Sequence, residues 1–251
     1  MNQIVLYAFL GTGFTFLMTT LGAAVVFLLG KNINDTLERI FAGFAAGVMM
    51  AASVWSLLLP AIDEAEKAGS AGWIPAGGGF LIGAVFLFLV QIKLEKRGHM
   101  NKSLFVTAVT LHNIPEGMAV GLAFALAVTA SADTALFAAA TALAFGIGIQ
   151  NFPEGAAISL PLYRDGIKKS RAFAIGTMTG IVEPVFGVLA AMCASLVSPL
   201  MPWLLSFAAG AMVYVVAEEL IPRANENGKT CGSIGVIAGF LIMMLLDVAL
   251  S

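Results

Sequence analysis

The stretch LFVTAVTLHNIPEGMAVGLAFALAVT, Leu104 to Thr129, has the composition of a membrane-spanning helix with polar residues at its centre. His112, Asn113 and Glu116 stand between two apolar flanks. A spanning helix needs about 20 predominantly apolar residues, and a carboxylate in hydrocarbon costs on the order of 2.5–3.5 kcal/mol on insertion scales. Polar residues at such a position predict a functional site.

The whole chain has the composition of a membrane protein. Of its 251 residues, 59% are hydrophobic and 11% are charged, and the mean hydropathy is +0.94. These values exclude the soluble enzyme classes. The expected fold is therefore all-α, with residues 1–251 forming a single polytopic domain of eight transmembrane helices. The helices are expected at residues 4–29, 41–62, 73–93, 104–129, 135–163, 172–197, 203–221 and 232–250.

Lysine and arginine positions predict the orientation, because these residues concentrate in cytoplasmic loops. If the amino terminus lies outside, only Lys67 of the thirteen basic residues faces out. Both termini are therefore expected outside, and topology explains the basic loops without a nucleic-acid partner. The twelve inner residues are Lys31, Arg39, Lys93, Lys96, Arg97, Lys102, Arg164, Lys168, Lys169, Arg171, Arg223 and Lys229.

An internal echo suggests an inverted repeat. FAAGVM at residues 44–49 resembles FAAGAM at residues 207–212, and each is followed by an apolar run that ends in LLP or LIP. On the expected topology the two helices run in opposite directions. Helices 1–3 are therefore expected to repeat as helices 6–8 around a central pair, helices 4 and 5, as in many transporters. The alternative is a chance recurrence of small residues that favour close helix packing.

A second polar phrase repeats the first. LHNIPEGMAVG at residues 111–121 returns as IQNFPEGAAIS at residues 149–159. On a helix, His112 and Glu116 stand one turn apart on the same face, and Asn113 lies beside them. Gln150, Asn151 and Glu154 repeat this layout. The proline of each phrase frees a backbone carbonyl one turn earlier, which also suits a cation.

The polar residues are expected to meet at one depth. A third glutamate, Glu183, precedes a proline in the expected sixth helix, and Met49 lies in the second. Counted from the predicted cytoplasmic ends, the candidate ligands lie roughly 12–20 Å deep at the helical rise of about 1.5 Å per residue. The residues at this level are Met49, His112, Glu116, Gln150, Glu154 and Glu183.

Three glutamates at one level without a lysine or arginine are expected either to be protonated or to surround a cation. The imidazole of His112 favours a metal over a bare proton path. Imidazole nitrogen, amide and carboxylate oxygens and a thioether suit Zn²⁺, Cd²⁺, Fe²⁺, Mn²⁺, Co²⁺ or Ni²⁺. Magnesium and calcium, which prefer all-oxygen ligands, fit less well. The metal is expected as transported substrate, and no cofactor is expected.

Several of these residues also have structural explanations. Glu183 taken alone fits a protonated packing residue, and Met49 fits core packing. Asn113 and Asn151 fit hydrogen bonds between helices. These explanations do not account for the repeated phrase, in which spacing and chemistry recur together.

Two acidic clusters lie at expected helix ends. Glu218 and Glu219 end the seventh helix on the inner side, where they are either an exit site for cations or solvated charges. Asp63 and Glu64, with Glu66 beside them, end the second helix on the outer side, where they either attract entering cations or form a solvated rim.

The motifs resemble those of the ZIP (Zrt/Irt-like) family of divalent metal transporters, whose fourth and fifth helices carry HNxPEG-type and HxxPEG-type motifs. HNIPEG, QNFPEG and GIVEP look most like the prokaryotic GufA-type branch. The resemblance covers the whole chain and implies a ZIP-like bundle that moves metal into the cytoplasm by alternating access. Zinc is the metal that it implies first. It also implies a homodimer in the bacterial inner membrane.

The resemblance further implies a two-metal centre. His112, Glu116, Gln150, Glu154 and Met49 would hold one ion. Asn113, Asn151 and Glu183 would hold a second, with Glu116 and Glu154 bridging. Relatives can carry aspartate at the position of Asn151, so the neutral amide weakens the second position. The loop between helices 3 and 4 has only His99 where family members often carry many histidines, so metal sensing by this loop is not expected.

Two other functions would use the same polar residues. An intramembrane metal-dependent hydrolase needs a histidine and carboxylates to activate water, but the chain has no HExxH motif and no evident nucleophile beside the polar faces. A proton-linked carrier of organic solutes would use the glutamates without metal. The sequence favours the metal transporter, which is not an enzyme.

Overall fold

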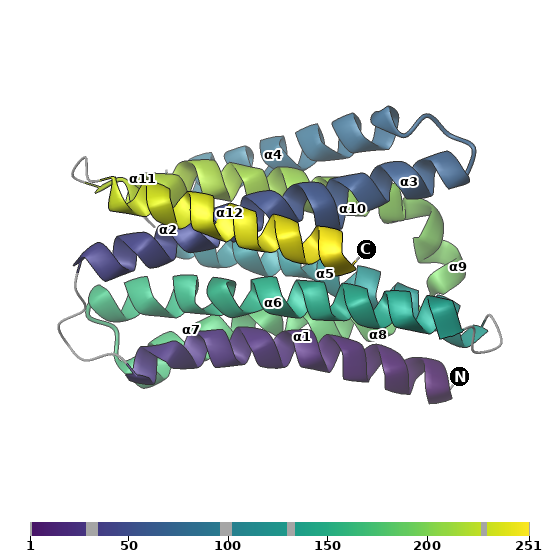
Figure 1. Ribbon diagram of the computed structural model, residues 1–251, viewed down its shortest axis with the longest axis horizontal. Helices are drawn as coiled ribbons and strands as arrows, with labels where there is room; N and C mark the ends of the chain where they lie inside the picture. The colour runs from purple at the N-terminus through teal and green to yellow at the C-terminus, as the bar shows by residue number, and fades with distance from the viewer. Residues whose placement is uncertain (1, 29–34, 96–101, 130–133, 227–229, 251) are drawn as a thin grey trace.

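The computed structural model describes residues 2–28, 35–95, 102–129, 134–226 and 230–250, which form a bundle of long helices (Figure 1). Within these ranges, eight helical spans are long and apolar enough to cross a membrane. Each overlaps one of the segments expected from the sequence, which confirms the eight-helix fold. The spans are Gln3–Leu28, Arg39–Lys67, Trp73–Lys93, Val109–Thr129, Thr134–Arg164, Lys169–Met192, Ala194–Ala224 and Cys231–Ala249.

Most spans are single α-helices, and three are interrupted. The uninterrupted helices are α1 (Asn2–Leu28), α4 (Trp73–Glu95), α5 (Lys102–Thr129), α6 (Thr134–Arg164) and α12 (Cys231–Leu250). The second span consists of α2 (Asp35–Ala52), the π-helical turn η1 (Ser53–Leu58) and α3 (Leu59–Lys67). The sixth consists of α7 (Lys169–Gly180) and α8 (Val182–Met192). The seventh consists of α9 (Ala194–Val197), the 3₁₀ turn η2 (Ser198–Leu200), α10 (Met201–Val215), the π-helical turn η3 (Val216–Leu220) and α11 (Ile221–Ala224).

The expected break at SPLMP is wrong in detail. The sixth span ends at Met192 rather than at residue 197, and SPLMP belongs to the helical turns that begin the seventh span. Pro199 and Pro202 each stand in the first turn of a helix, η2 and α10. A proline is tolerated there because its missing N–H has no intrahelical acceptor to lose.

The helices form two groups, which Figure 1 shows as two layers. In one group α1 packs on α6, and α5 packs on α8. In the other α2 packs on α12, and α4 packs on α10. The groups meet where α10 contacts α5 and where α2 contacts α6. The helices that carry the two PEG phrases, α5 and α6, therefore lie at the junction of the two groups.

The N-terminus lies at one end of the bundle, and α12 runs toward the same end, here named the terminal end; the opposite end is the distal end (Figure 1). Lys67 ends α3 at the terminal end, whereas Lys93, Arg164 and Lys169 stand at the distal ends of α4, α6 and α7. The distribution agrees with the expected charge asymmetry. Lys31, Lys96, Arg97, Lys229 and His99 lie outside the described residues.

Matching backbone contacts confirm the inverted repeat. A Cβ added to Gly239 of α12 would clash with the carbonyl oxygen of Phe44, and one added to Gly83 of α4 would clash with that of Phe207. Phe44 and Phe207 begin the two FAAG phrases. The same close approach therefore recurs in α2 with α12 and in α10 with α4, and α2 and α10 run in opposite directions through the bundle (Figure 1).

Helix packing in the group that contains α1, α5, α6 and α8 depends on glycines. Substitutions of Gly22 and Gly13 in α1 test this dependence. A Cβ at Gly22 would meet the carbonyl of Phe152, whereas a Cβ at Gly13 would meet no atom within 4 Å. Gly22→Ala should lower the free energy of unfolding by about 1–3 kcal/mol, the usual cost of overpacking. Gly13→Ala should leave it unchanged or raise it, since alanine favours helix. Thermal unfolding in detergent compares the two, and equal melting temperatures would contradict this packing model.

Candidate metal centre

The two PEG phrases lie in the middle of α5 and α6, which continue through Pro115 and Pro153. The glycine of each phrase admits a neighbouring backbone. A Cβ at Gly117 would clash with the backbone of Glu183 in α8, and a Cβ at Gly155 with the carbonyl of Thr19 in α1. These glycines therefore bring four helices together around the polar residues.

Burial of the predicted polar ligands is nearly complete. None of the seven is more than 1% exposed: His112, Asn113, Glu116, Gln150, Asn151, Glu154 and Glu183. Charged groups are almost never fully buried unless they are paired or bind a metal. Their common burial distinguishes this centre from the charged helix ends.

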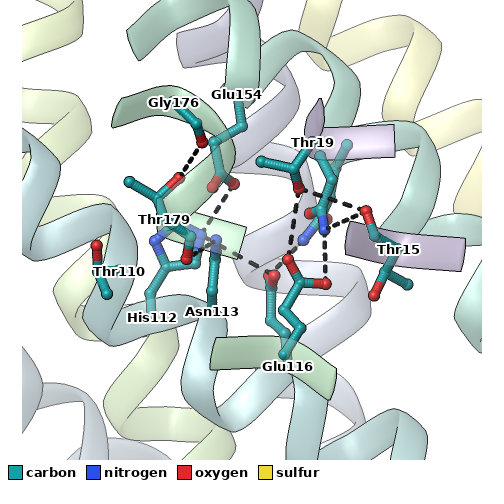
Figure 2. Close-up of polar contacts among 12 residues, drawn as sticks. Thr15, Thr19, Thr110, His112, Asn113, Glu116, Glu154, Gly176 and Thr179 are labelled. Atoms are coloured by element: carbon teal, nitrogen blue, oxygen red, sulfur yellow. Dashed lines mark hydrogen bonds and ion pairs between the residues drawn. The ribbon is translucent and has the colours of Figure 1, made fainter. Parts of the chain in front are cut away.

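Three of these side chains form a first cluster. The Nε2 atom of His112 lies 3.1 Å from Oε2 of Glu154 and 4.0 Å from Oε2 of Glu116. One ligand atom from each residue lies within 4.8 Å of the others. Figure 2 shows the imidazole of His112 and the carboxylate of Glu154 facing each other. Tetrahedral zinc with bonds of about 2.0–2.1 Å separates its ligand atoms by about 3.3 Å, so this spacing suits such an ion.

Gln150 completes the first cluster. It stands in the second phrase where His112 stands in the first. Its Nε2 donates a hydrogen bond to Oε1 of Glu116. The amide therefore holds one oxygen of the carboxylate, and the other oxygen of Glu116 is the one directed at His112.

The remaining polar residues form a second cluster. Asn151 donates from Nδ2 to Oε2 of Glu183 at 2.9 Å and to the carbonyl of Thr15 at 3.4 Å. Thr19 donates to Oε1 of Glu183 at 3.4 Å, and Figure 2 shows Thr15 and Thr19 side by side at the cluster. Asn113 donates from Nδ2 to the carbonyl of Thr179 at 3.2 Å. The oxygens of Glu183 thus already accept hydrogen bonds.

A break in the sixth span sets the position of Glu183. The chain leaves α7 at Gly180 and enters α8 at Val182, so Glu183 stands in the first turn of α8. Pro184 has no N–H to donate to the carbonyl of Gly180, which explains the break. The N-terminus of α8 also places positive dipole ends beside the carboxylate.

Acceptor oxygens without donors are concentrated in the two clusters. Within the two clusters, five buried side-chain oxygens have no hydrogen-bond partner among the described residues. Buried acceptors of this kind cost free energy unless a positive or donating group reaches them. They are Oδ1 of Asn113, Oε2 of Glu116, Oε1 of Gln150, Oδ1 of Asn151 and Oε1 of Glu154.

Met49 is 2% exposed and belongs to the central hydrophobic cluster, on a helix that contacts α6. Its position is compatible with a ligand role and with core packing.

The acidic helix ends lie apart from the centre. Asp63 is exposed and forms an ion pair of 2.5 Å with Lys67, and Glu64 is exposed beside it. Glu218 is exposed, whereas Glu219 is 6% exposed with Oε2 3.9 Å from Nε of Arg223. Glu218 and Glu219 line a cavity of about 470 Å³ at the distal end.

The sequence interpretation missed Asp247. This residue is half-buried in α12, and its Oδ1 accepts a hydrogen bond of 2.9 Å from Ser56 of η1. Both line a cavity of about 210 Å³ between η1, α6 and α12. An acidic residue within the apolar run MMLLDVAL was the signal available in the sequence.

Comparison with known proteins agrees with this geometry. Residues 91–247 match a family model described as ZIP zinc transporter. The chain belongs to the ZIP zinc transporter family. It is an integral multi-pass membrane protein whose transported substrates are metal ions. The family membership confirms the resemblance inferred from the PEG phrases.

Similar relatives cover most of this ZIP chain. It is 38% identical to zinc transporter ZIP11 of Xenopus tropicalis, over 98% of either chain. It is 34% identical to zinc transporter GufA of Myxococcus xanthus, over 92% of this chain and 94% of the relative. It is 35% identical to zinc transporter ZIPB of Bordetella bronchiseptica, over 97% and 81%. All three are named as transporters, in agreement with the expected role.

Removal of the imidazole tests the first cluster. His112→Ala should weaken zinc binding by about 100-fold or more, because even the outer partners of metal ligands are worth about 10–100-fold. Isothermal titration of the purified protein in detergent measures the affinity. Thr141→Ala, an exposed polar residue of α6, is the control and should bind zinc like the parent. Equal affinities in the two variants would exclude His112 as a ligand.

Proposed function

We propose that this ZIP protein imports zinc or a similar divalent transition metal by alternating access through the buried centre. The five acceptor oxygens without donors around His112 support this best. Among the described residues, His112 is the only basic side chain within ion-pair distance of Glu116 or Glu154. One imidazole does not neutralise two carboxylates and satisfy three amide oxygens, whereas a dication serves both purposes.

The first ion is held by His112, Glu116, Gln150 and Glu154, with the thioether of Met49 as a further ligand. Nitrogen, oxygen and sulfur in one set favour borderline metals such as Zn²⁺, Cd²⁺, Fe²⁺, Mn²⁺, Co²⁺ and Ni²⁺ over magnesium or calcium. Gln150 binds through its Oε1 while its Nε2 keeps the bond to Glu116.

A second ion position is formed by Asn113, Asn151 and Glu183, with Glu116 and Glu154 bridging. Oδ1 of either asparagine is buried and without a hydrogen-bond partner within the described ranges. Glu183 must give up bonds from Asn151 and Thr19 to bind a metal fully. We therefore propose that the second ion binds more weakly than the first.

The metal enters from the terminal end and leaves at the distal end. The entry route passes the cavity that Ser56 and Asp247 line, and Asp63 and Glu64 contribute a more distant acidic rim. On the exit side Glu218 and Glu219 line the distal cavity. The distal end carries most of the described basic residues, which supports a cytoplasmic position for it and an outer position for both termini.

Residues 1–251 form a single polytopic domain that acts as a homodimer in the bacterial inner membrane. The two helix groups share one central hydrophobic cluster, which supports one domain rather than two. The occurrence of similar proteins in the bacteria Myxococcus xanthus and Bordetella bronchiseptica supports the location.

Metal flux tests this function. Proteoliposomes that contain the parent protein should accumulate zinc down its gradient. Glu154→Ala should reduce uptake to the level of protein-free vesicles, because the variant loses one of the two carboxylates facing His112. Thr141→Ala changes an exposed residue on the same helix as Glu154 and should transport like the parent. If the parent moves no divalent metal and Glu154→Ala behaves identically, the proposal is wrong.

The entry route has its own test. Asp247→Asn should raise the zinc concentration needed for half-maximal uptake by about fivefold, which corresponds to roughly 1 kcal/mol of lost charge attraction. The maximal rate should stay nearly unchanged, since the buried centre is intact. Asp63→Asn is the comparison variant and should raise this concentration less, because Asp63 belongs to the more distant rim and is already paired with Lys67. Equal uptake curves for the two variants would remove Asp247 from the route.

A further inference from the structure

Met212 is buried at a position that the inverted repeat makes equivalent to Met49. The phrases at residues 44–49 and 207–212 end in these two methionines. Each methionine is followed, after the same three-residue interval, by a π-helical turn, η1 or η3. Met49 is 2% exposed and Met212 is 0% exposed. π-Helical turns are frequent at functional sites, and here both adjoin a buried thioether.

Glycines two residues earlier give the directions of the two side chains. Gly47 is in backbone contact with Val236 of α12, and Gly210 with Phe80 of α4. Residues two apart on an α-helix point about 200° apart. Both methionines therefore turn away from the neighbour within their own helix group. Because they are buried, they face the interior of the bundle, where α2 contacts α6 and α10 contacts α5.

The two methionines also share a depth. At the distal side, the span of Met49 begins at Arg39 and the span of Met212 ends at Ala224. Met49 lies ten residues from Arg39, and Met212 lies twelve residues from Ala224. At about 1.5 Å per residue these positions are roughly 15 and 18 Å deep. Two thioethers from antiparallel helices thus stand at one level, beside the helices that carry the metal centre.

We propose that Met212 is a second thioether ligand for the transported metal, used in the access state opposite to the one in which Met49 binds it. This inference rests on the proposed alternating-access function. In a transporter built from inverted repeats, rocking or gating of one repeat against the other changes the access. A ligand supplied by one repeat in one state therefore has its equivalent in the other repeat in the other state.

Ion selectivity tests the role of the sulfur. Thioethers favour soft cations, so Cd²⁺ should depend on Met212 more than Mn²⁺ does. Met212→Leu keeps an apolar side chain of similar volume and should lower the ratio of Cd²⁺ to Mn²⁺ uptake by about fivefold at subsaturating metal in proteoliposomes. Met212→Cys restores a sulfur ligand and should return the ratio to within about twofold of the parent.

Met201→Leu is the matched control, because Met201 lies on the same helix α10 and is 1% exposed. It should leave the Cd²⁺ to Mn²⁺ ratio unchanged. The inference is overturned if Met212→Leu and Met201→Leu give the same ratio, or if Met212→Leu and Met212→Cys lower it equally. Absence of all metal uptake by the parent protein would instead overturn the proposed function, and this inference with it.

Discussion

A group of carboxylate and amide oxygens sealed at mid-depth is the constraint on which the structure depends. Glu116 and Glu154 are buried beside a single imidazole, and five acceptor oxygens of the clusters have no hydrogen-bond partner among the described residues. Close packing raises the free-energy cost of burying these charged groups. Gly117 and Gly155 admit neighbouring backbones, which leave little space for water. In such surroundings a charge interacts far more strongly than it does in water. In the proposed function, a bound dication takes the place of the lysine or arginine that these groups lack.

The inverted repeat explains how one centre can serve two sides of a membrane. The contacts of Phe44 with Gly239 and of Phe207 with Gly83 are equivalent in antiparallel halves of the fold. The same repeat relation that makes α2 equivalent to α10 makes α5 equivalent to α6. It therefore relates one PEG phrase to the other. The repeat is not chemically symmetric, since His112 has Gln150 as its counterpart. A second histidine would strengthen nitrogen coordination, whereas the amide supplies an oxygen and also holds Glu116 through a hydrogen bond.

Much of this architecture was predictable from the sequence because a membrane limits the alternatives. Apolar length identified all eight spans, and the doubled phrase identified the cluster of His112, Glu116 and Glu154. The helical turns around Pro199 were not predicted, because a proline marks a break equally well as a helix start. Asp247 was missed because its partner Ser56 is distant in the chain. The hydrogen bonds to Glu183 depend on Thr19, whose role has no periodic signal in α1.

The neutral side chain of residue 151 makes the two clusters differ in charge, and in the proposed function this makes the two ion positions differ in affinity. The first cluster combines two carboxylates with an imidazole, and its ligand spacing already suits a small dication. In the second, the amide of Asn151 adds no charge, and it donates to Glu183, as Thr19 does. A metal at the second position must compete with these hydrogen bonds to Glu183. At the first position each of Glu116, Gln150 and Glu154 has one oxygen without a hydrogen-bond donor. Strong binding at both positions would slow release, because a transported ion must bind tightly enough to enter and loosely enough to leave. In the proposed function, the amide at position 151 therefore favours transport of a single tightly bound ion, with Glu183 stabilising the helices around it.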